Sequence, residues 1–364
     1  MWMKKNDVIR LTAAVFLVLL DGTAMILFLH FPDFFFPAYR NFSKQWIFFL
    51  SRMVSFCPGA VWDFLLPFLI LAVILTLIHT IRHQKRFFAW FTSLLLIVSV
   101  LLSEAVLGWM LNHYAPPLAE ELGYDVQMYE TEVLYEACEF YLQKASDYAL
   151  LIDRDIEGHL LRSDFNALAQ EAGSIYEDLG KQYPVLQGSN LPVKKLTVVG
   201  EYLMYNGIIG MFMPLSGEAG VPLSVPSAPM PYTMAHEAAH RLGIASEEEA
   251  NFAAFLACVQ SDDIRFLYSG YYSAFAYCYS SLYSVQPEQC LQLKEQYLET
   301  EGGRLLFLDR SDTRSLYDSY DSPLQEVSDH INDTYLKTFS EESGIQSYGE
   351  VTDDLITWYL LQKK

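Results

Sequence analysis

Three long apolar segments in the first third of the chain constrain its architecture more than any other feature. They cover approximately residues 8–29, 61–81 and 88–111. A helix needs about 20 residues to cross the hydrocarbon core of a bilayer, so each segment is long enough to span one. Asp21 lies inside the first segment and Glu104 inside the third. Acids at that depth are costly, so each is either a polar contact inside the bundle or a carboxyl group without a task.

Net charge divides the 364-residue chain at about His113. Residues 1–113 contain nine Lys/Arg and five Asp/Glu, a net charge of +4, and the remainder contains 15 and 39, a net of −24. This asymmetry predicts a transmembrane anchor with three spans over 1–113 and an acidic, water-soluble domain over 114–364. We expect the anchor to contact membrane lipid. Nucleic acid is not an expected partner, because the acidic domain would repel phosphate groups.

Basic residues beside the spans predict the orientation of a multi-pass protein in the cell membrane. The residues expected on the cytoplasmic side are Lys4, Lys5, Arg10, Arg82, Lys85 and Arg86. The N-terminus is therefore predicted to be cytoplasmic and the soluble domain extracytoplasmic. The loop between the first two spans carries three further basic residues, Arg40, Lys44 and Arg52, which argue against this orientation. The same loop is rich in aromatic residues and could lie along the membrane interface with its charges extended into water.

The soluble domain has a mixed pattern in which helix dominates. Apolar residues recur every three or four positions over about 126–183, which predicts helices. The run "KKLTVVGEYL" (194–203) is typical of a short strand. Glycine and proline interrupt residues 207–226, which favours a hairpin or an irregular edge strand. Because the pattern is helical again from Pro231, we expect a mainly helical α+β domain with a small sheet.

The motif "HEAAH" follows this sheet. His236 and His240 are four residues apart and face the same side of a helix, so two imidazoles can converge on one metal ion. Glu237 is placed to hold a metal-bound water and to take its proton rather than to bind the metal. Pro231 suits the first turn of that helix, and Gly243 suits its end. The motif therefore predicts a Zn²⁺ site with Glu237 as the general base.

The acidic run "SEEEAN" (246–251) predicts the start of a second helix. Ser246 and Glu249 form a capping-box pattern, and Glu247 in the first turn shares a face with Asn251. Catalytic zinc usually has three protein ligands, so we expect Glu247 to be the third ligand and Asn251 to orient a ligand. In the alternative, the three acids only complement the helix dipole. Two imidazoles and a carboxylate also suit other divalent metals.

Two further features have weaker support. Tyr268 and Tyr271 in "YSGYY" could donate a hydrogen bond to an oxyanion on a substrate carbonyl. Packing is the alternative, in a chain with 24 tyrosines. An extended peptide could add to an edge strand in "MFMPLSGEAG" (211–220). In the alternative, Glu218 in this stretch is a loop residue without a role.

The combined pattern resembles a known family. HExxHxxG at 236–243, followed by ExxAN at 247–251, is similar to the bacterial domain-of-unknown-function family 3810 of membrane-anchored HExxH proteins. "GMFMPLSGEAGV" before the motif and "RFLYSGYYSAFAY" after it extend the resemblance, which covers nearly the whole chain. The motif is also similar to gluzincin-type zinc metallopeptidases. That resemblance implies a zincin-like fold with His236, His240 and Glu247 as ligands, although only six residues separate His240 from Glu247.

We therefore expect a membrane-anchored zinc metallopeptidase that cleaves peptides or proteins at the membrane surface with a zinc-activated water. The alternative is a non-catalytic binding or sensing module, tethered to the membrane, in which zinc holds two helices together. Intramembrane proteolysis is disfavoured because the motif lies more than a hundred residues beyond the last apolar segment.

Overall fold

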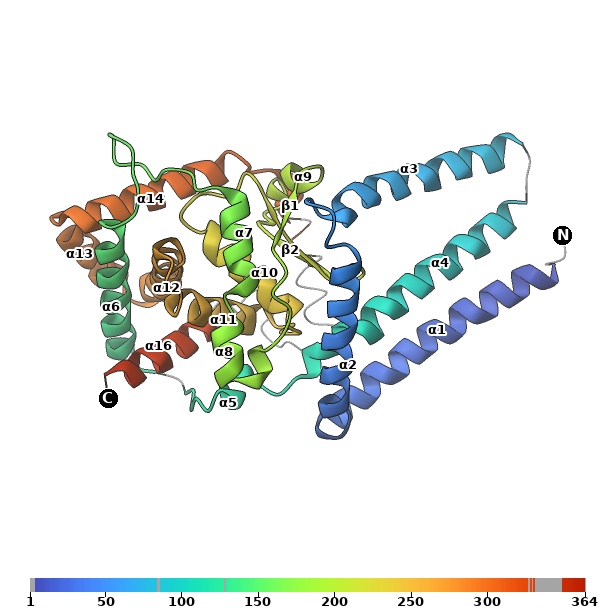
Figure 1. Ribbon diagram of the computed structural model, residues 1–364, viewed down its shortest axis with the longest axis horizontal. Coiled ribbons are helices and arrows are strands. Elements are labelled where there is room, and N and C mark those ends of the chain that lie inside the picture. The colour runs from blue at the N-terminus through green and yellow to red at the C-terminus, as the bar shows by residue number, and fades with distance from the viewer. Residues whose placement is uncertain are drawn as a thin grey trace. The chain divides into compact units, whose positions relative to one another are not determined.

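The structure is a computed structural model that describes residues 4–83, 86–127, 129–326, 328, 330 and 349–363. Lys85, one of the residues on which the predicted orientation rests, lies outside the described residues. The chain forms two compact units. Unit 1 contains Met1–Ala115 and Met213–Glu218, and unit 2 contains Pro116–Phe212 and Ala219–Lys364. Helices dominate both units (Figure 1).

Unit 1 is built from long helices. These are α1 (Lys5–His30), α2 (Pro32–Met53), α3 (Val61–Arg82) and α4 (Phe87–Gly108), followed by the 3-10 helix η1 (Met110–Tyr114). In the described part of the chain, three segments are long and apolar enough to cross a membrane: Lys5–His30, Val61–Arg82 and Phe87–Tyr114. Each of them contains one predicted span. The expected apolar helices are therefore confirmed, and they indicate membrane association.

Asp21 and Glu104, the two acids singled out in the apolar segments, have polar partners within unit 1. Ser103 Oγ donates a hydrogen bond to Asp21 Oδ2 at 2.7 Å. Trp46 Nε1 donates one to Glu104 Oε1 at 2.7 Å. A polar group that loses its hydration needs such an internal partner. These two acids thus form polar contacts between helices of the unit.

The aromatic-rich loop between the first two spans forms the helix α2. One of its faces is buried, at a spacing of three and four residues: Phe36, Tyr39, Ser43, Ile47 and Ser51. Two of its basic side chains lie over phenylalanine rings, Arg40 over Phe36 and Arg52 over Phe48. Two of the basic residues of α2 therefore make cation–π contacts with aromatic rings of the same helix.

The small sheet has three strands in the order β1-β3-β2. The strands are β1 (Lys194–Leu196), β2 (Met211–Met213) and β3 (Glu218–Pro222). β1 pairs in parallel with β3 from Lys194 opposite Gly220 to Leu196 opposite Pro222. The predicted strand over 194–203 is therefore too long, and part of its second half forms helix α9 (Gly200–Met204). The pairing stops where Pro222 lacks the N–H needed to extend the ladder.

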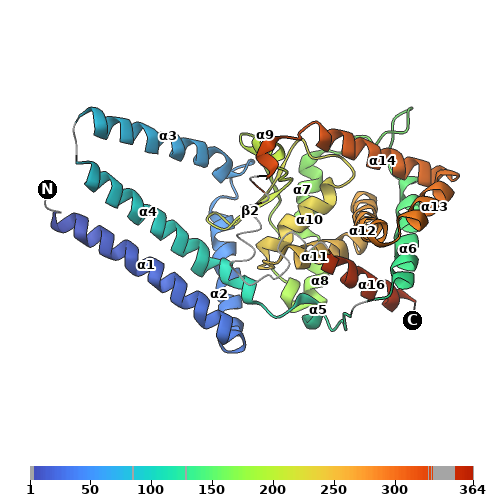
Figure 2. The same ribbon diagram turned by 180° about the vertical axis from the view of Figure 1, so that it is seen from behind.

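The other elements that the structure describes in unit 2 are helical. They are α5 (Leu118–Glu121), α6 (Thr131–Ala149), α7 (Phe165–Ser174), α8 (Glu177–Gln182), η2 (Pro184–Leu186), α10 (Met230–Arg241), α11 (Glu247–Val259), α12 (Ile264–Val285), α13 (Pro287–Leu298), α14 (Glu301–Asp318) and α16 (Glu350–Gln362). α12 packs against α6, α10, α11, α13 and α16, and lies among them (Figure 1, Figure 2). The largest buried side chains of this core are aromatic: Tyr141, Tyr268, Phe252, Phe255, Phe266 and Phe275.

Candidate metal centre

The HExxH motif lies on α10, as its spacing predicts. Pro231 is in the first turn of α10, and Gly243 follows its end with a φ of 89°. A left-handed residue at this position ends a helix and lets the chain reverse direction. His236 and His240 are one turn apart on the helix, with ring centroids 4.6 Å apart. The local sequence therefore places both imidazoles side by side.

α11 begins at Glu247, the first of the three consecutive glutamates. Ser246 takes the N-cap position, but its side chain makes no capping hydrogen bond, so the predicted capping box is not formed. Glu249 Oε1 accepts a hydrogen bond from the Leu118 backbone N–H at 2.7 Å. Glu249 therefore connects α11 to the first residue of α5. Glu247 lies in the first turn of α11, which faces α10.

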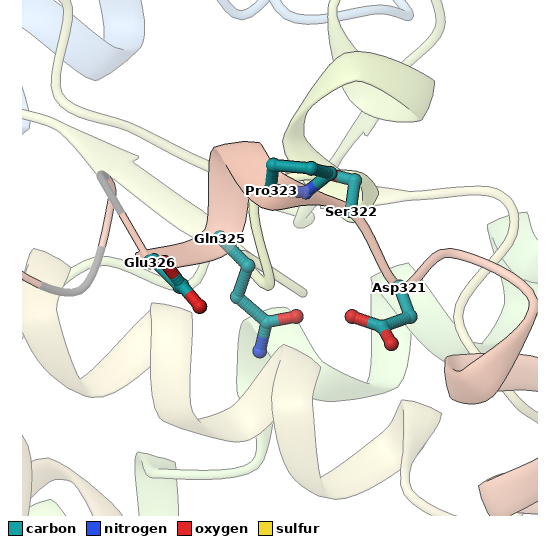
Figure 3. A pocket seen from close by; sticks show the side chains of 5 residues that line it. All are labelled: Asp321, Ser322, Pro323, Gln325 and Glu326. Atoms are coloured by element: carbon teal, nitrogen blue, oxygen red, sulfur yellow. The ribbon is translucent and has the colours of Figure 1, made fainter.

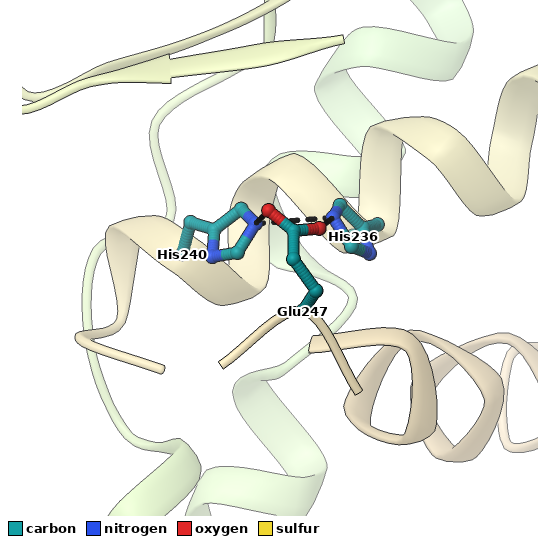
Figure 4. A group of neighbouring side chains, drawn as sticks. All are labelled: His236, His240 and Glu247. Atoms are coloured by element: carbon teal, nitrogen blue, oxygen red, sulfur yellow. Dashed lines mark hydrogen bonds and ion pairs between the residues drawn. The ribbon is translucent and has the colours of Figure 1, made fainter. Parts of the chain in front are cut away.

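The structure brings His236, His240 and Glu247 together (Figure 4). His236 Nε2 lies 3.2 Å from Glu247 Oε2, and His240 Nε2 lies 3.6 Å from Glu247 Oε1. The two Nε2 atoms are 3.0 Å apart. Tetrahedral zinc with bonds of about 2.0–2.1 Å separates neighbouring ligand atoms by roughly 3.3 Å. The three observed separations bracket that value, so the donor set fits one zinc ion.

The backbone fixes the orientation of one imidazole. His240 Nδ1 lies 2.7 Å from the Ile244 carbonyl oxygen, which can only accept a hydrogen bond. Nδ1 is therefore the donor, and in the neutral ring the lone pair is on Nε2, the atom that faces Glu247. His236 Nδ1 is buried and has no hydrogen-bond partner among the described residues. The polar contacts of the second ring are instead made through Nε2, which lies 3.2 Å from Glu247 Oε2.

The charges of the three side chains are coupled. Burial lowers the pKa of His240, but the Glu247 carboxylate outweighs it and raises that pKa to about 9. Burial raises the pKa of Glu247, but His240 and His236 hold it well below its usual range. The Glu247 carboxylate therefore favours the protonated form of the His240 imidazole. A divalent cation would replace that proton, since only the deprotonated ligand binds.

Glu237 lies beside the triad without belonging to it. The side chain is buried, and Oε2 has no hydrogen-bond partner in the described part of the chain. Burial raises the pKa of this carboxyl to about 7. A methyl group on Gly210 would lie 2.8 Å from both Cγ and Cδ of Glu237. Gly210 immediately precedes β2, so Glu237 occupies space that only a glycine leaves open at the edge of the sheet.

The remaining predicted site residues have partners outside the triad. Asn251 is buried on α11, where Tyr232 Oη donates to its backbone carbonyl at 2.8 Å and approaches its side-chain Oδ1 at 3.4 Å. Tyr268 Oη donates to Asp309 on α14. Tyr271 packs in an aromatic cluster, 5.4 Å between ring centroids from Tyr148. Both tyrosines are buried and have the surroundings of core residues.

Sequence reasoning did not identify Tyr232 as part of this region. Its hydroxyl joins α10 to α11, and the Ser269 hydroxyl accepts a hydrogen bond from the Tyr232 backbone N–H at 3.0 Å. Ser269 in turn donates to the Ala228 carbonyl at 2.6 Å. The available signal was the position of Tyr232, four residues before His236 on the same helical face. These bonds fix the start of α10 against its neighbours.

A separate pocket in unit 2 has a different composition. Its volume is about 480 Å³, and it is lined by Asp321, Ser322, Pro323, Gln325 and Glu326 (Figure 3). Among the described residues, the side chains that could share a metal ion are those of the triad, and Asp321 and Glu326 are not among them. The triad is therefore the candidate metal centre.

The comparisons with known proteins point to one family. The sequence model of a family described as "protein of unknown function (DUF3810)" matches residues 39–356. A search of the curated proteins and a search of the solved structures gave no match.

Proposed function

The chain belongs to the DUF3810 family of proteins of unknown function, and from that premise we propose that it is a membrane-anchored zinc metallopeptidase. The observation that carries the proposal is the triad of His236, His240 and Glu247, whose ligand atoms all lie within 4.8 Å of one another. A histidine pair on one helix and an acid on the next resembles the donor set of gluzincin-type peptidases. On this proposal unit 2 has a zincin-like fold.

Each residue then has one task. His236, His240 and Glu247 hold the ion, and a fourth position is open to water or substrate. When bound, zinc supplies Lewis acidity towards water and a carbonyl oxygen. Glu237 takes a proton from the attacking water and delivers it to the leaving amine. Its free Oε2 supports this role, because a purely structural carboxylate in a buried place would be satisfied by its neighbours.

The edge strand favours an extended substrate. β2 is an edge strand of the sheet, and it begins at Met211. The residue before it, Gly210, lies against Glu237. A peptide that adds to such an edge gains main-chain hydrogen bonds and presents its carbonyl groups at regular intervals. Peptides or proteins at the membrane surface are therefore the proposed substrates. The basic residues beside the spans place unit 2 outside the cytoplasm in this proposal.

One observation favours the alternative of a binding or sensing module. The triad joins two consecutive helices, and His240 is only 6% exposed. Structural zinc sites also stabilise a fold by joining elements in this way. In that case the ion would need Glu247 but not Glu237.

The two functions differ in the effect of Glu237→Gln on the full chain in lipid nanodiscs. If the protein is a peptidase, the variant retains zinc and cleaves a peptide library about 10²–10⁴-fold more slowly than the wild type, the range of general acid–base catalysis. Glu248→Gln, which changes a neighbouring acid outside the triad, is the control and cleaves normally. If the zinc-loaded wild type cleaves no peptide, the binding module is the better account.

A further inference from the structure

The connection between α9 and β2 borders the proposed catalytic base. Residues 205–210 make up this connection, and they belong to unit 2 together with α10. The last of them, Gly210, lies against Glu237, so that a methyl group on the glycine would lie 2.8 Å from both Cγ and Cδ of the glutamate. The position of residues 205–210 therefore limits the space that is open to the Glu237 carboxyl.

α9 is fixed by the core on one side and continues into a tight turn. Leu203 and Met204 are 7% and 3% exposed, which anchors the inner side of this helix. The chain then turns at Gly207, whose φ of 74° is in the left-handed region. The Gly207 N–H donates to the Met204 carbonyl at 3.0 Å, and the Ile208 N–H donates to the Leu203 carbonyl at 3.0 Å. Both bonds end on α9, so they shape the turn without attaching it to another element.

Residues 320–325, called the strap below, attach this turn to the segment after α14. They follow α14 in the chain and lie beside α9 in both views (Figure 1, Figure 2). Ser322 Oγ donates a hydrogen bond to the Tyr205 backbone carbonyl at 2.6 Å. Gln325, which Figure 3 labels together with Ser322, lies against Gly207: a methyl group on this glycine would be 3.0 Å from the Gln325 amide nitrogen and 3.1 Å from its Cδ. The strap therefore contacts both ends of the turn.

Glu201 on α9 joins the strap to the segment that leads into α10. Its Oε2 accepts a hydrogen bond from Tyr320 Oη at 2.7 Å, and its Oε1 accepts one from Ser224 Oγ. Ser224 lies between β3 and α10. The hydrogen bonds from Ser224 and Tyr320 lower the pKa of the Glu201 carboxyl, which favours the charged form that accepts both. The outer side of α9 is therefore held by two other segments of unit 2.

We propose that Ser322 and Glu201 are positioning residues for the catalytic base Glu237. The strap and the Glu201 carboxylate hold residues 205–210 in place, and Gly210 then confines the Glu237 carboxyl beside the metal centre. Gly210 lies three residues after the glycine of the turn. This is roughly 10 Å of extended chain, so a loosened turn lets Gly210 move away from the carboxyl. The inference rests on the proposed role of Glu237, and all of its contacts lie within unit 2.

The first test compares two serines near the end of α14 in the full, zinc-loaded chain in phosphatidylcholine nanodiscs. Ser322→Ala removes the hydroxyl that donates to Tyr205. Ser319→Ala is the matched control, since the Ser319 hydroxyl donates to the Leu316 carbonyl in the last turn of α14 at 2.6 Å. Amide hydrogen exchange of residues 205–212 is measured by mass spectrometry, and kcat, KM and zinc content are determined for each variant.

The second test acts on the Glu201 carboxylate. Glu201→Ala removes both acceptor oxygens, whereas Glu201→Gln keeps one of them. Tyr202→Phe is the control, because it changes the next residue of α9, whose side chain is 60% exposed. We expect Glu201→Ala to behave like Ser322→Ala and Glu201→Gln to lie between Glu201→Ala and the wild type. Tyr202→Phe should match the wild type.

Positioning predicts that residues 205–212 exchange about 3- to 10-fold faster in Ser322→Ala, the effect of one lost hydrogen bond. The kcat falls about tenfold, less than the roughly 10²-fold effect of a lasting displacement of about 1 Å, while KM and zinc content stay at the wild-type level. An unchanged kcat, as a merely structural role requires, overturns the proposal, and so does equal exchange in the two serine variants. If the wild type cleaves nothing, the peptidase proposal fails, and the exchange of residues 205–212 alone decides whether the strap holds the connection. If Glu201→Ala loses the protection of α12 and is unfolded, the serine pair decides.

Discussion

His236 Nε2 lies 3.2 Å from Glu247 Oε2, although the two residues belong to different helices. Only six residues separate His240 from Glu247, and Gly243, in the left-handed region, lies within that connection. The turn returns the chain so that the first residue of α11 faces the imidazoles of α10. A short connection is thus sufficient to bring a third donor to an HExxH helix.

Gly210→Ala should separate metal binding from catalysis. The three atoms nearest to the added methyl group all belong to Glu237, so the substitution would displace that carboxyl first. We expect zinc content to stay at the wild-type level and kcat to fall by about 10²-fold, the effect of a displacement of roughly 1 Å in a catalytic group. Zinc analysis and peptide cleavage measure the two effects. Gly22→Ala is the control, because a methyl group at Gly22 meets no atom within 4 Å.

Tyr232→Phe should weaken the contact between the two helices of the site. It removes the hydroxyl that donates to the Asn251 carbonyl and leaves buried acceptors without their donor. We expect a loss of about 1–3 kcal/mol in the free energy of unfolding. Zinc affinity should fall about tenfold, the lower end of the effect of residues that support metal ligands. Denaturant titration and chelator competition test both, with Tyr202→Phe at an exposed tyrosine as the control. Equal behaviour of the two variants would show that this bond does not support the site.

Tyr268→Phe should affect stability and leave the site intact. Tyr268 Oη donates to Asp309, and Arg154 contacts both carboxylate oxygens of Asp309 at 2.8 Å. The three side chains form a buried network, so loss of one donor costs about 1–3 kcal/mol. Asp309→Ala leaves the Arg154 charge without its carboxylate and should cost about 3–5 kcal/mol. Thermal unfolding in the full chain measures both. A Tyr268→Phe variant of normal stability that cleaves peptides 10²-fold more slowly would restore Tyr268 as an oxyanion donor.

His159 should titrate above its usual pKa. Its Nδ1 lies 2.6 Å from Asp312 Oδ2, and the hydrogen bond and charge of Asp312 raise the pKa of the imidazole. A raised folded-state pKa stabilises the folded protein below the unfolded value of about 6.5, and this contribution is lost as pH rises through the folded value. Residues 153–161 should therefore exchange amide hydrogens faster, after correction for intrinsic rates, above that pKa than below it. Asp312→Asn should return the His159 pKa towards 6.5, as measured by histidine C2–H exchange. An identical pKa in both proteins would contradict the ion pair.

The features that the sequence predicts well are those set by neighbouring residues. The apolar spans follow from composition, and the imidazole pair follows from a spacing of four on one helix. The approach of Glu247 was predicted from the number of protein ligands that zinc prefers, and the end of the first helix from the position of Gly243.

The features that it could not predict depend on residues far apart in the chain. Tyr268 reaches Asp309 across 41 positions, and Glu218 caps a helix 157 positions earlier. No local pattern distinguishes a buried capping glutamate from a solvated one. The strand over 194–203 was predicted too long because its partner, β3, ends at Pro222. Tertiary pairing here overrides the preference of β-branched residues for strand.

The central claim is that Glu247 binds the same ion as the two histidines, and metal analysis of matched variants tests it most directly. The full-length wild type should contain about one zinc per chain, and His236→Ala, His240→Ala and Glu247→Ala should each lose most of it, because a missing ligand removes most of the affinity of the site. Glu248→Ala, one residue further along α11, should keep it. If Glu247→Ala and Glu248→Ala retain equal amounts of zinc, the acids only complement the helix dipole, and the proposed metal centre is wrong.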